Sequence, residues 1–440
     1  MPRRTLPALL LVCSLTYACN SDDDDKTVPA QACKSQDLCD ITEPSCVESL
    51  LELTACVREN DVPPLPDIEH LTSTEASARL ASELMAEGAM ATTPWDPALR
   101  ALSLLPPGTS SIEAAVAQFI ESVAAYYDPE TKRVTILTDS AASTDTLSQM
   151  YVMSHELTHY IQDEEHDLLR MQDESESSTD RAVALSSLVE GDAVVTSTRV
   201  LIKLMNRSAN NFAWENYFGV LQDDMLFQIE ASPAPLAEAV QDLPYTVGGL
   251  AVAQRWKAQG REGVDELFET WPQAMTDWLD RELDPEDSGV APLACAPPLA
   301  PEGFTLYELD SFGSVGAFAM LVAAGAGDLD LAASLRSDAI ALYVTDDAEE
   351  PGSARVIAVW RLRFQSADRA QSFERALAGT SARLEIRRRG DELSIRASSD
   401  PEASALRGTT LDACPKLTEL EPANETPDMP RAFRRSGFRR

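Results

Sequence analysis

The sequence predicts an α+β fold that is mainly helical. Apolar side chains recur at helical spacing through most of the first 280 residues, while β-rich runs form one hairpin there and dominate the segment after residue 304. At 440 residues the chain is long enough for two or three domains. We expect a signal peptide (1–19), a flexible tether (20–32), a disulfide-stapled helical module (33–66), a zincin-like catalytic domain (67–290), a small α+β domain (291–423) and a basic tail (424–440). Proline-rich stretches mark the end of the stapled module and the start of the small α+β domain.

The individual elements follow from these patterns. Helical periodicity predicts helices at 74–86, 112–125, 147–163, 182–195, 250–258, 264–279 and 367–377. Alternation predicts a hairpin over 126–137 and C-terminal strands at 339–344, 355–364, 382–387 and 392–397. The polar segment 171–179 is expected to be a surface loop.

The charge balance restricts the partners. Seventy-two acidic residues against 36 basic ones give a formal charge of −36. Such a body repels phosphate backbones and anionic lipid surfaces, so we expect no nucleic-acid partner and no membrane contact through the folded part.

The first 19 residues have the pattern of an export signal. Arg3 and Arg4 precede an apolar run, which ends in Thr16-Tyr17-Ala18-Cys19. A small residue before such a Cys resembles a bacterial lipobox, in which Cys19 would carry the lipid. Ordinary secretion with cleavage nearby is the alternative. We therefore expect an exported protein of the bacterial cell envelope, anchored to a membrane by its N-terminal lipid alone.

The cysteines predict disulfides. Four closely spaced cysteines in an exported chain more often form two disulfides than a zinc site, and neither a CxxC pair nor a nearby His is present. Three pairings are possible. Two further cysteines flank the C-terminal domain and are expected to close its ends. The cysteines concerned are Cys33, Cys39, Cys46 and Cys56, followed by Cys295 and Cys414.

One stretch predicts a metal site. In Ser154-His155-Glu156-Leu157-Thr158-His159 the two imidazoles stand four residues apart on a predicted helix, so both can face one ion, with Glu156 beside the open position. The chain has four His, so a chance match is rare. A solvated helix with two incidental histidines is the alternative. This pattern predicts a zinc hydrolase with a zincin-like metal helix.

Glu190 is the best candidate for the third ligand. It interrupts a helix that is apolar almost all round, where a carboxylate is costly unless a cation compensates it. An exposed or salt-bridged Glu190 is the alternative. Asp192 is a weaker candidate, suited to supporting a ligand. A metzincin pattern would require Gly and His where the chain has Gln162 and Glu165.

Two further segments are candidates for the substrate site. The hairpin at 126–137 would provide an edge strand above the metal helix for extended substrate, although it could also be scaffold. Tyr245, expected on a loop before Gly248 and Gly249, could donate its hydroxyl to an oxyanion, or it could simply pack.

Together these residues resemble a family of uncharacterised bacterial envelope zinc metalloproteins of gluzincin type. The resemblance covers about residues 122–278. The matching motifs are Tyr127-Asp128-Pro129, His155–His159 with Gln162-Asp163, Glu190-Gly191-Asp192-Ala193 and Pro244-Tyr245-Thr246-Val247-Gly248. Departures occur at His166-Asp167-Leu168 and at Ala274-Met275-Thr276-Asp277.

The implied activity is zinc-dependent hydrolysis of a peptide or protein. His155, His159 and Glu190 would hold Zn²⁺, and Glu156 would act as general base. The alternative is a non-catalytic envelope lipoprotein with a structural or vestigial zinc site that acts as a binding module. A metal store is a third reading, but the chain lacks the His-rich or Cys-rich tract typical of one.

Overall fold

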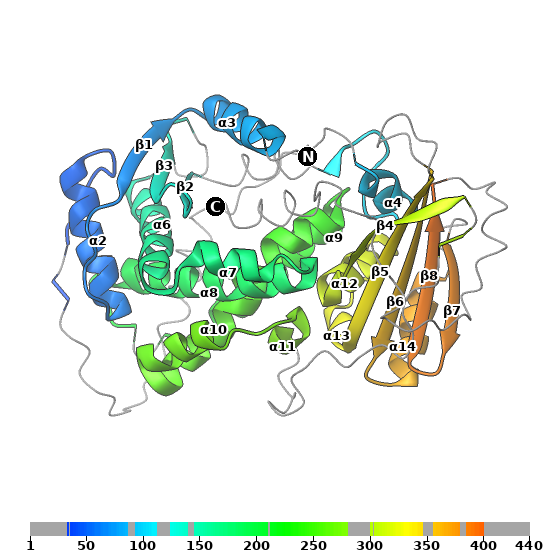
Figure 1. Cartoon of the computed structure of the whole chain (residues 1–440). Helices are drawn as coiled ribbons and strands as arrows, with labels where there is room; N and C mark the ends of the chain where they lie inside the picture. Colours follow the sequence, from blue (N-terminus) through cyan, green and yellow to red (C-terminus); the bar gives the residue numbers. More distant parts are fainter. Residues whose placement is uncertain are drawn as a thin grey trace.

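The computed structural model describes residues 33–34, 36–86, 93–111, 124–139, 145–209, 212–279, 300–301, 303–345, 355–378 and 384–399. In these ranges the protein is mainly helical and carries two small sheets, so the predicted α+β class is confirmed at this level. Figure 1 shows the three-stranded sheet near one end of the molecule and the five-stranded sheet at the other, with helices between them. Within the described part, no helix combines the length and hydropathy that a bilayer-spanning segment requires.

The first part of the chain is built largely from helices. Its elements are α2 (Pro44–Arg58), β1 (Asp67–Leu71), α3 (Ser73–Ala86), α4 (Trp95–Ala101), β2 (Ala125–Asp128), β3 (Arg133–Leu137), α6 (Thr146–His166), α7 (Leu168–Ser175), α8 (Thr179–Leu204), α9 (Trp214–Ala231), α10 (Pro235–Glu269) and α11 (Met275–Leu279).

Helix α6 carries the two histidines of the motif. Asp145 caps its N-terminus, and the Asp145 side chain accepts a hydrogen bond from the Ser148 N–H at 3.0 Å. Met150, Met153 and Leu157 share one helical face and are fully buried. This face packs against α2, and the two helices share one apolar cluster.

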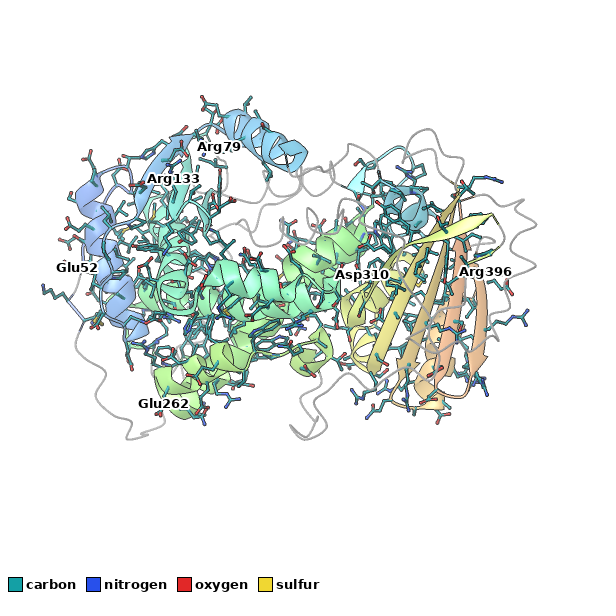
Figure 2. All side chains as sticks on the ribbon, in the orientation of Figure 1. Glu52, Arg79, Arg133, Glu262, Asp310 and Arg396 are labelled. Carbon is teal, nitrogen blue, oxygen red and sulfur yellow. A yellow bond between two sulfur atoms is a disulfide. The ribbon has the colours of Figure 1, made fainter. Side chains whose placement is uncertain are left out.

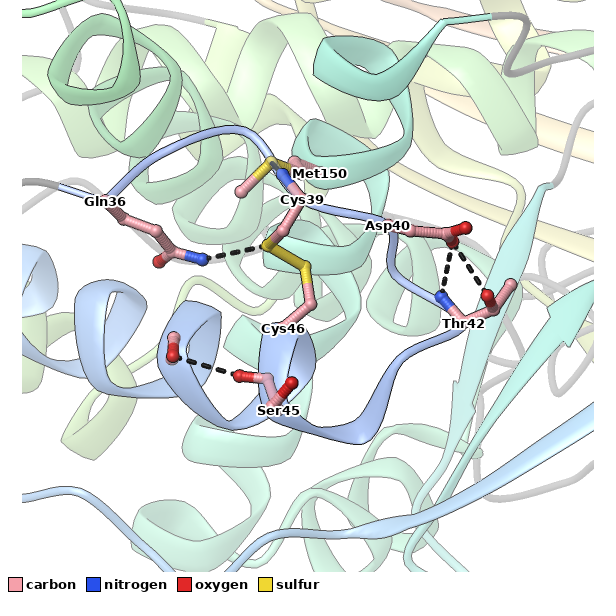
Figure 3. The surroundings of a disulfide bond; sticks show 8 residues. Gln36, Cys39, Asp40, Thr42, Ser45, Cys46 and Met150 are labelled. Carbon is pink, nitrogen blue, oxygen red and sulfur yellow. Dashed lines mark hydrogen bonds between the residues drawn. A yellow bond between two sulfur atoms is a disulfide. The ribbon is translucent and has the colours of Figure 1, made fainter.

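The N-terminal module is stapled by two disulfides, as the cysteine pattern predicts. The structure selects one of the three pairings, Cys33–Cys56 and Cys39–Cys46. Figure 3 shows the second of these beside Met150 of α6, whose sulfur accepts a hydrogen bond from the Cys39 N–H. The module therefore packs directly on the metal-motif helix.

The predicted hairpin is present. Strands β2 and β3 pair antiparallel, with Tyr127 opposite Val134, and β1 pairs parallel to β3 on the other side. In this sheet β2 is an edge strand, next to α6.

The C-terminal elements form an antiparallel sheet in the order β4-β5-β6-β8-β7. Helices α12 and α14 pack against it, and one apolar cluster continues from α8 and α10 into the sheet. The elements are β4 (Phe304–Asp310), α12 (Gly313–Ala323), α13 (Leu329–Ala333), β5 (Leu335–Thr345), β6 (Val356–Phe364), α14 (Ala367–Leu377), β7 (Leu384–Arg389) and β8 (Glu392–Ser398).

The sheet meets the helices at Asp310, which Figure 2 labels. The Asp310 carboxylate accepts hydrogen bonds from the N–H and hydroxyl of Thr179, at 2.8 and 2.6 Å. The last residue of β4 thereby satisfies the first turn of α8.

Two predictions about secondary structure are wrong, and a third is wrong in one bound. Residues 171–179 are not a loop, because α7 occupies most of them and buries Leu168 and Met171 against the core. Tyr245 does not lie on a loop, because α10 continues through Pro244. The two helices expected at 250–258 and 264–279 are confirmed as separate helical stretches, because α10 consists of two helices that meet at a kink at Gly260. The second of them ends at Glu269 rather than at 279, and Met275–Leu279 form the separate α11.

Proline is unfavourable inside a helix by about 3 kcal/mol. The buried packing of Leu243, Val247 and Leu250 outweighs that cost here. Sequence alone could not weigh the two effects.

Several predictions fall outside the described residues. They are the signal peptide, tether and basic tail, the lipidation site Cys19, the disulfide between Cys295 and Cys414, and almost all of the helix at 112–125, whose last residue, Ala125, begins β2.

Candidate metal centre

His155, His159 and Glu190 converge at one buried point. The two Nε2 atoms are 3.0 Å apart, His155 Nε2 lies 3.1 Å from Glu190 Oε2, and His159 Nε2 lies 3.6 Å from the same oxygen. All three residues are buried, and their ligand atoms are grouped closely enough to hold a metal ion.

The donor set fits a zinc ion. Ligand atoms about 2.0–2.1 Å from a tetrahedral zinc stand about 3.3 Å from one another. The three observed separations lie on both sides of that value. Three protein ligands of the His₂Glu type are also the set that leaves a fourth position open in catalytic zinc sites.

The electrostatics of the group favour a cation. Burial by itself disfavours the charged forms of both His159 and Glu190. The facing carboxylate nevertheless raises the pKa of His159 to about 9, and the imidazoles lower the pKa of Glu190. Positive charge is therefore stabilised at this point, and a bound metal would replace the proton.

A close crossing of α8 and α10 brings Glu190 and Tyr245 to the motif. Gly191 follows Glu190 and lies against the backbone of Gly248, and a methyl group at Gly248 would overlap the carbonyl of Ser187. Only residues without a Cβ allow this approach. The glycines of both sequence motifs thus set the distance between the two helices.

Tyr245 stands one turn before this crossing, on α10. Its ring is stacked on His155, with centroids 6.0 Å apart and an interplanar angle of 17°. The side chain is half-buried at the edge of the core.

Glu156 faces the edge strand. It is buried, and its carboxylate accepts a hydrogen bond from the Tyr127 N–H at 2.9 Å. The Leu137 N–H donates to the Ala124 carbonyl, so alternation along β2 directs the backbone groups of Ala125 and Tyr127 away from β3. The outer edge of β2 therefore meets α6 beside Glu156.

Asp163 holds the hairpin to the metal helix. Its carboxylate accepts hydrogen bonds from the Tyr127 hydroxyl at 2.7 Å and from the Leu168 N–H at 2.9 Å. Burial raises the pKa of Asp163 and also that of Tyr127. One residue of the Gln-Asp segment thus connects α6, α7 and β2.

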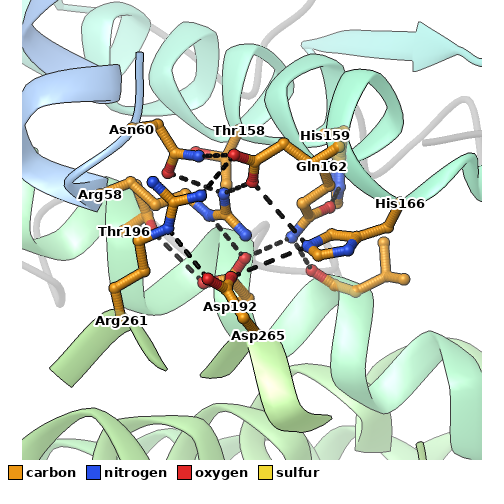
Figure 4. A network of polar contacts seen from close by, with 12 residues as sticks. Arg58, Asn60, Thr158, His159, Gln162, His166, Asp192, Thr196, Arg261 and Asp265 are labelled. Carbon is orange, nitrogen blue, oxygen red and sulfur yellow. Dashed lines mark hydrogen bonds and ion pairs between the residues drawn. The ribbon is translucent and has the colours of Figure 1, made fainter. Parts of the chain in front are cut away.

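Gln162 orients His159, one of the candidate ligands. Its Oε1 lies 2.9 Å from His159 Nδ1, and its Nε2 donates to the Val189 carbonyl at 3.0 Å and to Asp192 at 2.8 Å. Asp192 is therefore two hydrogen bonds from His159 rather than at the metal position. Figure 4 shows this connection and its continuation to Arg58.

A second group in the described residues could also hold a metal, namely Glu165, His166 and Asp265. Two arginines already pair with its carboxylates. Arg58 contacts Glu165 at 2.6 Å, and Arg261 contacts Glu165 at 2.7 Å and Asp265 at 3.0 Å. These positive charges disfavour another cation, so we assign no metal to this group.

Comparisons with known proteins give no relative. No protein-family model matches the chain, and no match was found among curated proteins or among solved structures. The candidate site is therefore argued from its own geometry.

The sequence alone gives no role at the site to two residues that the structure places there. Gln162 lies three positions after His159, on a neighbouring part of the same helical face, which is a detectable pattern. Arg58 is separated from Asp192 by 134 positions, and no motif points to it.

Proposed function

We propose that the protein is a zinc-dependent hydrolase of gluzincin type, with peptides or proteins as substrates. The observation that carries this proposal is the convergence of two imidazoles and one carboxylate at one buried point. A second carboxylate, Glu156, follows His155 in the sequence and is buried between α6 and β2, close enough to raise the pKa of His159. A purely structural metal site has no use for a base at that position.

Each residue has a distinct task in the proposed reaction. His155, His159 and Glu190 would hold zinc, which when bound supplies Lewis acidity and makes water a nucleophile near neutral pH. Glu156 would take the proton from the attacking water and pass it to the leaving amine. Tyr245 would donate a hydrogen bond to the oxyanion.

The edge of β2 supports an extended peptide as substrate. The backbone groups of Ala125 and the carbonyl of Tyr127 are directed away from β3, and the Tyr127 N–H on the same side already donates to Glu156. An extended chain that pairs with this edge would pass its carbonyl groups close to the base.

We also propose that the protein works in the cell envelope, anchored through Cys19. The two disulfides support an oxidising compartment. Replacing Cys19 by Ser should release the protein from membranes into the soluble fraction. Unchanged membrane attachment would contradict the lipid anchor.

The central experiment compares Glu156→Gln with wild type in a broad peptide-cleavage screen after metal analysis of both proteins. Glu156→Gln should keep about one zinc per chain, yet lose about 10²- to 10⁴-fold in cleavage rate, because the amide cannot accept a proton. Glu164→Gln is the matched control. Glu164 lies on the same helix and is exposed, paired with Lys132 at 2.6 Å.

The outcomes separate the alternatives. A wild-type protein without zinc would contradict the metal site. Zinc binding with equal cleavage by wild type and Glu156→Gln would assign the activity to another site or a contaminant. Zinc binding without any cleavage would favour the binding module.

A further inference from the structure

Arg58 is a fully buried charge at an unexpected place. It ends α2, two residues after the disulfide-bonded Cys56, and its side chain is 1% exposed. A buried guanidinium is costly unless carboxylates pair with it. Burial disfavours its charged form, but Asp192 and Glu165 outweigh that effect and raise the pKa of Arg58.

Its contacts lead toward the metal centre. Arg58 Nε donates to Asp192 Oδ2 at 2.9 Å, and the same oxygen accepts the hydrogen bond from Gln162 Nε2. Asp192 is entirely buried. Arg58 therefore supplies the positive charge that a carboxylate requires at that depth.

The orientation of the Gln162 amide follows from these partners. Both groups that face its nitrogen, the Val189 carbonyl and the Asp192 carboxylate, can only accept hydrogen bonds. The amide oxygen must then point at His159 Nδ1. When its imidazole is neutral, as metal binding requires, His159 consequently carries its proton on Nδ1 and directs the Nε2 lone pair toward Glu190 and His155.

We propose that Arg58 is a positioning residue for the metal centre, and this inference rests on the zinc site of the proposed function. Through Asp192 and Gln162, it holds His159 in the tautomer and orientation that metal binding requires. The disulfide-bonded N-terminal module thereby contributes to the site without touching the metal.

The test uses the full chain and two measurements. Zinc affinity is measured by chelator competition, and the tautomer of His159 is measured by ¹⁵N NMR of the metal-free protein above about pH 10, where the imidazole is neutral. Supporting residues around a metal typically contribute about 10- to 100-fold in affinity. Arg58→Met should weaken zinc binding by about that factor and give a mixture of tautomers. Arg58→Lys keeps the positive charge but lacks the planar guanidinium with its several donors. Its zinc affinity should fall less, by about three- to tenfold.

Arg261→Met is the matched control. Arg261 belongs to the same polar network and pairs with Glu165 and Asp265, but it makes no described contact with Asp192. Its zinc affinity and tautomer should equal those of wild type. A general loss of stability would affect both arginine variants without changing the tautomer.

A double-mutant cycle covers the case in which Arg58→Met does not fold. Gln162→Met breaks the connection while Arg58 and Asp192 remain paired, and it should weaken zinc binding about 10- to 100-fold. If Arg58 acts through Gln162, adding Arg58→Lys to Gln162→Met should cost no further affinity. Equal losses from Arg58→Lys in both backgrounds would overturn the proposal. Failure of wild type to bind zinc would instead contradict the metal site itself.

Discussion

Two regions of the molecule bury carboxylates, and they compensate the charge in opposite ways. At the candidate metal centre, Glu190 faces the Nε2 atoms of His155 and His159. At the junction of the helices with the sheet, Asp338 accepts hydrogen bonds from the Phe312 N–H at 2.9 Å and the Trp360 indole N–H at 2.7 Å.

The difference lies in what each carboxylate meets. Asp338 is surrounded by N–H and O–H groups, including the Ser311 hydroxyl, which already carry the hydrogens it accepts. Glu190 meets nitrogen atoms whose lone pairs converge with its own. Such a group is satisfied only by a proton or a metal ion. The kind of donor around a buried acid therefore distinguishes a structural junction from a candidate metal site.

The largest expected effect is on zinc stoichiometry. His155→Ala and His159→Ala should each reduce bound zinc from about one per chain to none, because two remaining ligands do not form a catalytic-type site. Asp338→Asn, at the junction, should keep the full amount. Metal analysis of the purified variants checks both. Full zinc occupancy in either His variant would contradict the assignment of Glu190 and the two histidines as a metal site.

The pH dependence of stability should differ in sign from that of an ordinary salt-bridged acid. Burial raises the pKa of Asp338 to about 6, in spite of hydrogen bonds from Ser311 and Trp360. The folded state then binds this proton more tightly than the unfolded chain, whose Asp pKa is about 3.9. The stabilising contribution of Asp338 to the free energy of unfolding is fully present below about pH 4 and is lost as the pH rises through 6.

This contribution amounts to about 3 kcal/mol, at about 1.4 kcal/mol per pKa unit. Between pH 4 and pH 7, the free energy of unfolding of wild type should fall by about 2 kcal/mol relative to Asp338→Asn, since the unfolded Asp is already partly ionised at pH 4. Urea titrations at several pH values measure the difference. Asp391→Asn, which changes a part-exposed acid paired with Arg363, should follow wild type. If the free energies of unfolding of wild type and Asp338→Asn change with pH in parallel, the raised pKa of Asp338 is disproved.

Steric effects on stability are expected at the glycines of the two regions. A methyl group at Gly248 would overlap Ser187, and one at Gly313 would overlap Asp180. Each Ala variant should lose about 1–3 kcal/mol of stability or more, as overpacked sites do. Only Gly248→Ala should also weaken zinc binding, because it separates the helix of Tyr245 from that of Glu190.

Gly219→Ala provides the control for these variants. Gly219 lies within α9, and nothing stands within 4 Å of the added carbon. The change should stabilise the protein by about 0.5–1 kcal/mol through helix propensity. Thermal unfolding with and without zinc measures all three variants. An equal effect of zinc on Gly248→Ala and Gly219→Ala would contradict the role of the helix crossing.

Much of the fold could be read from local periodicity. Residues 147–163 and 367–377 alternate apolar and polar faces, and they form α6 and α14 close to the expected bounds. By contrast, α12 is buried along nearly its whole length, so it has no polar face by which a helix is recognised. The sequence predicts loops around Pro244 and after Met171 for a related reason. Both segments are helical because they pack against α8, and their local sequence does not show this.

The sequence by itself determined the parts of the site that lie within one helix. His155, Glu156 and His159 are placed by the geometry of a single turn, which depends only on neighbouring residues. The tertiary structure alone decided the disulfide pairing, the approach of Glu190 from 35 positions away and the contact between Arg58 and Asp192 over 134 positions. These contacts depend on how separate helices pack, and packing is a property of the whole chain rather than of any one segment.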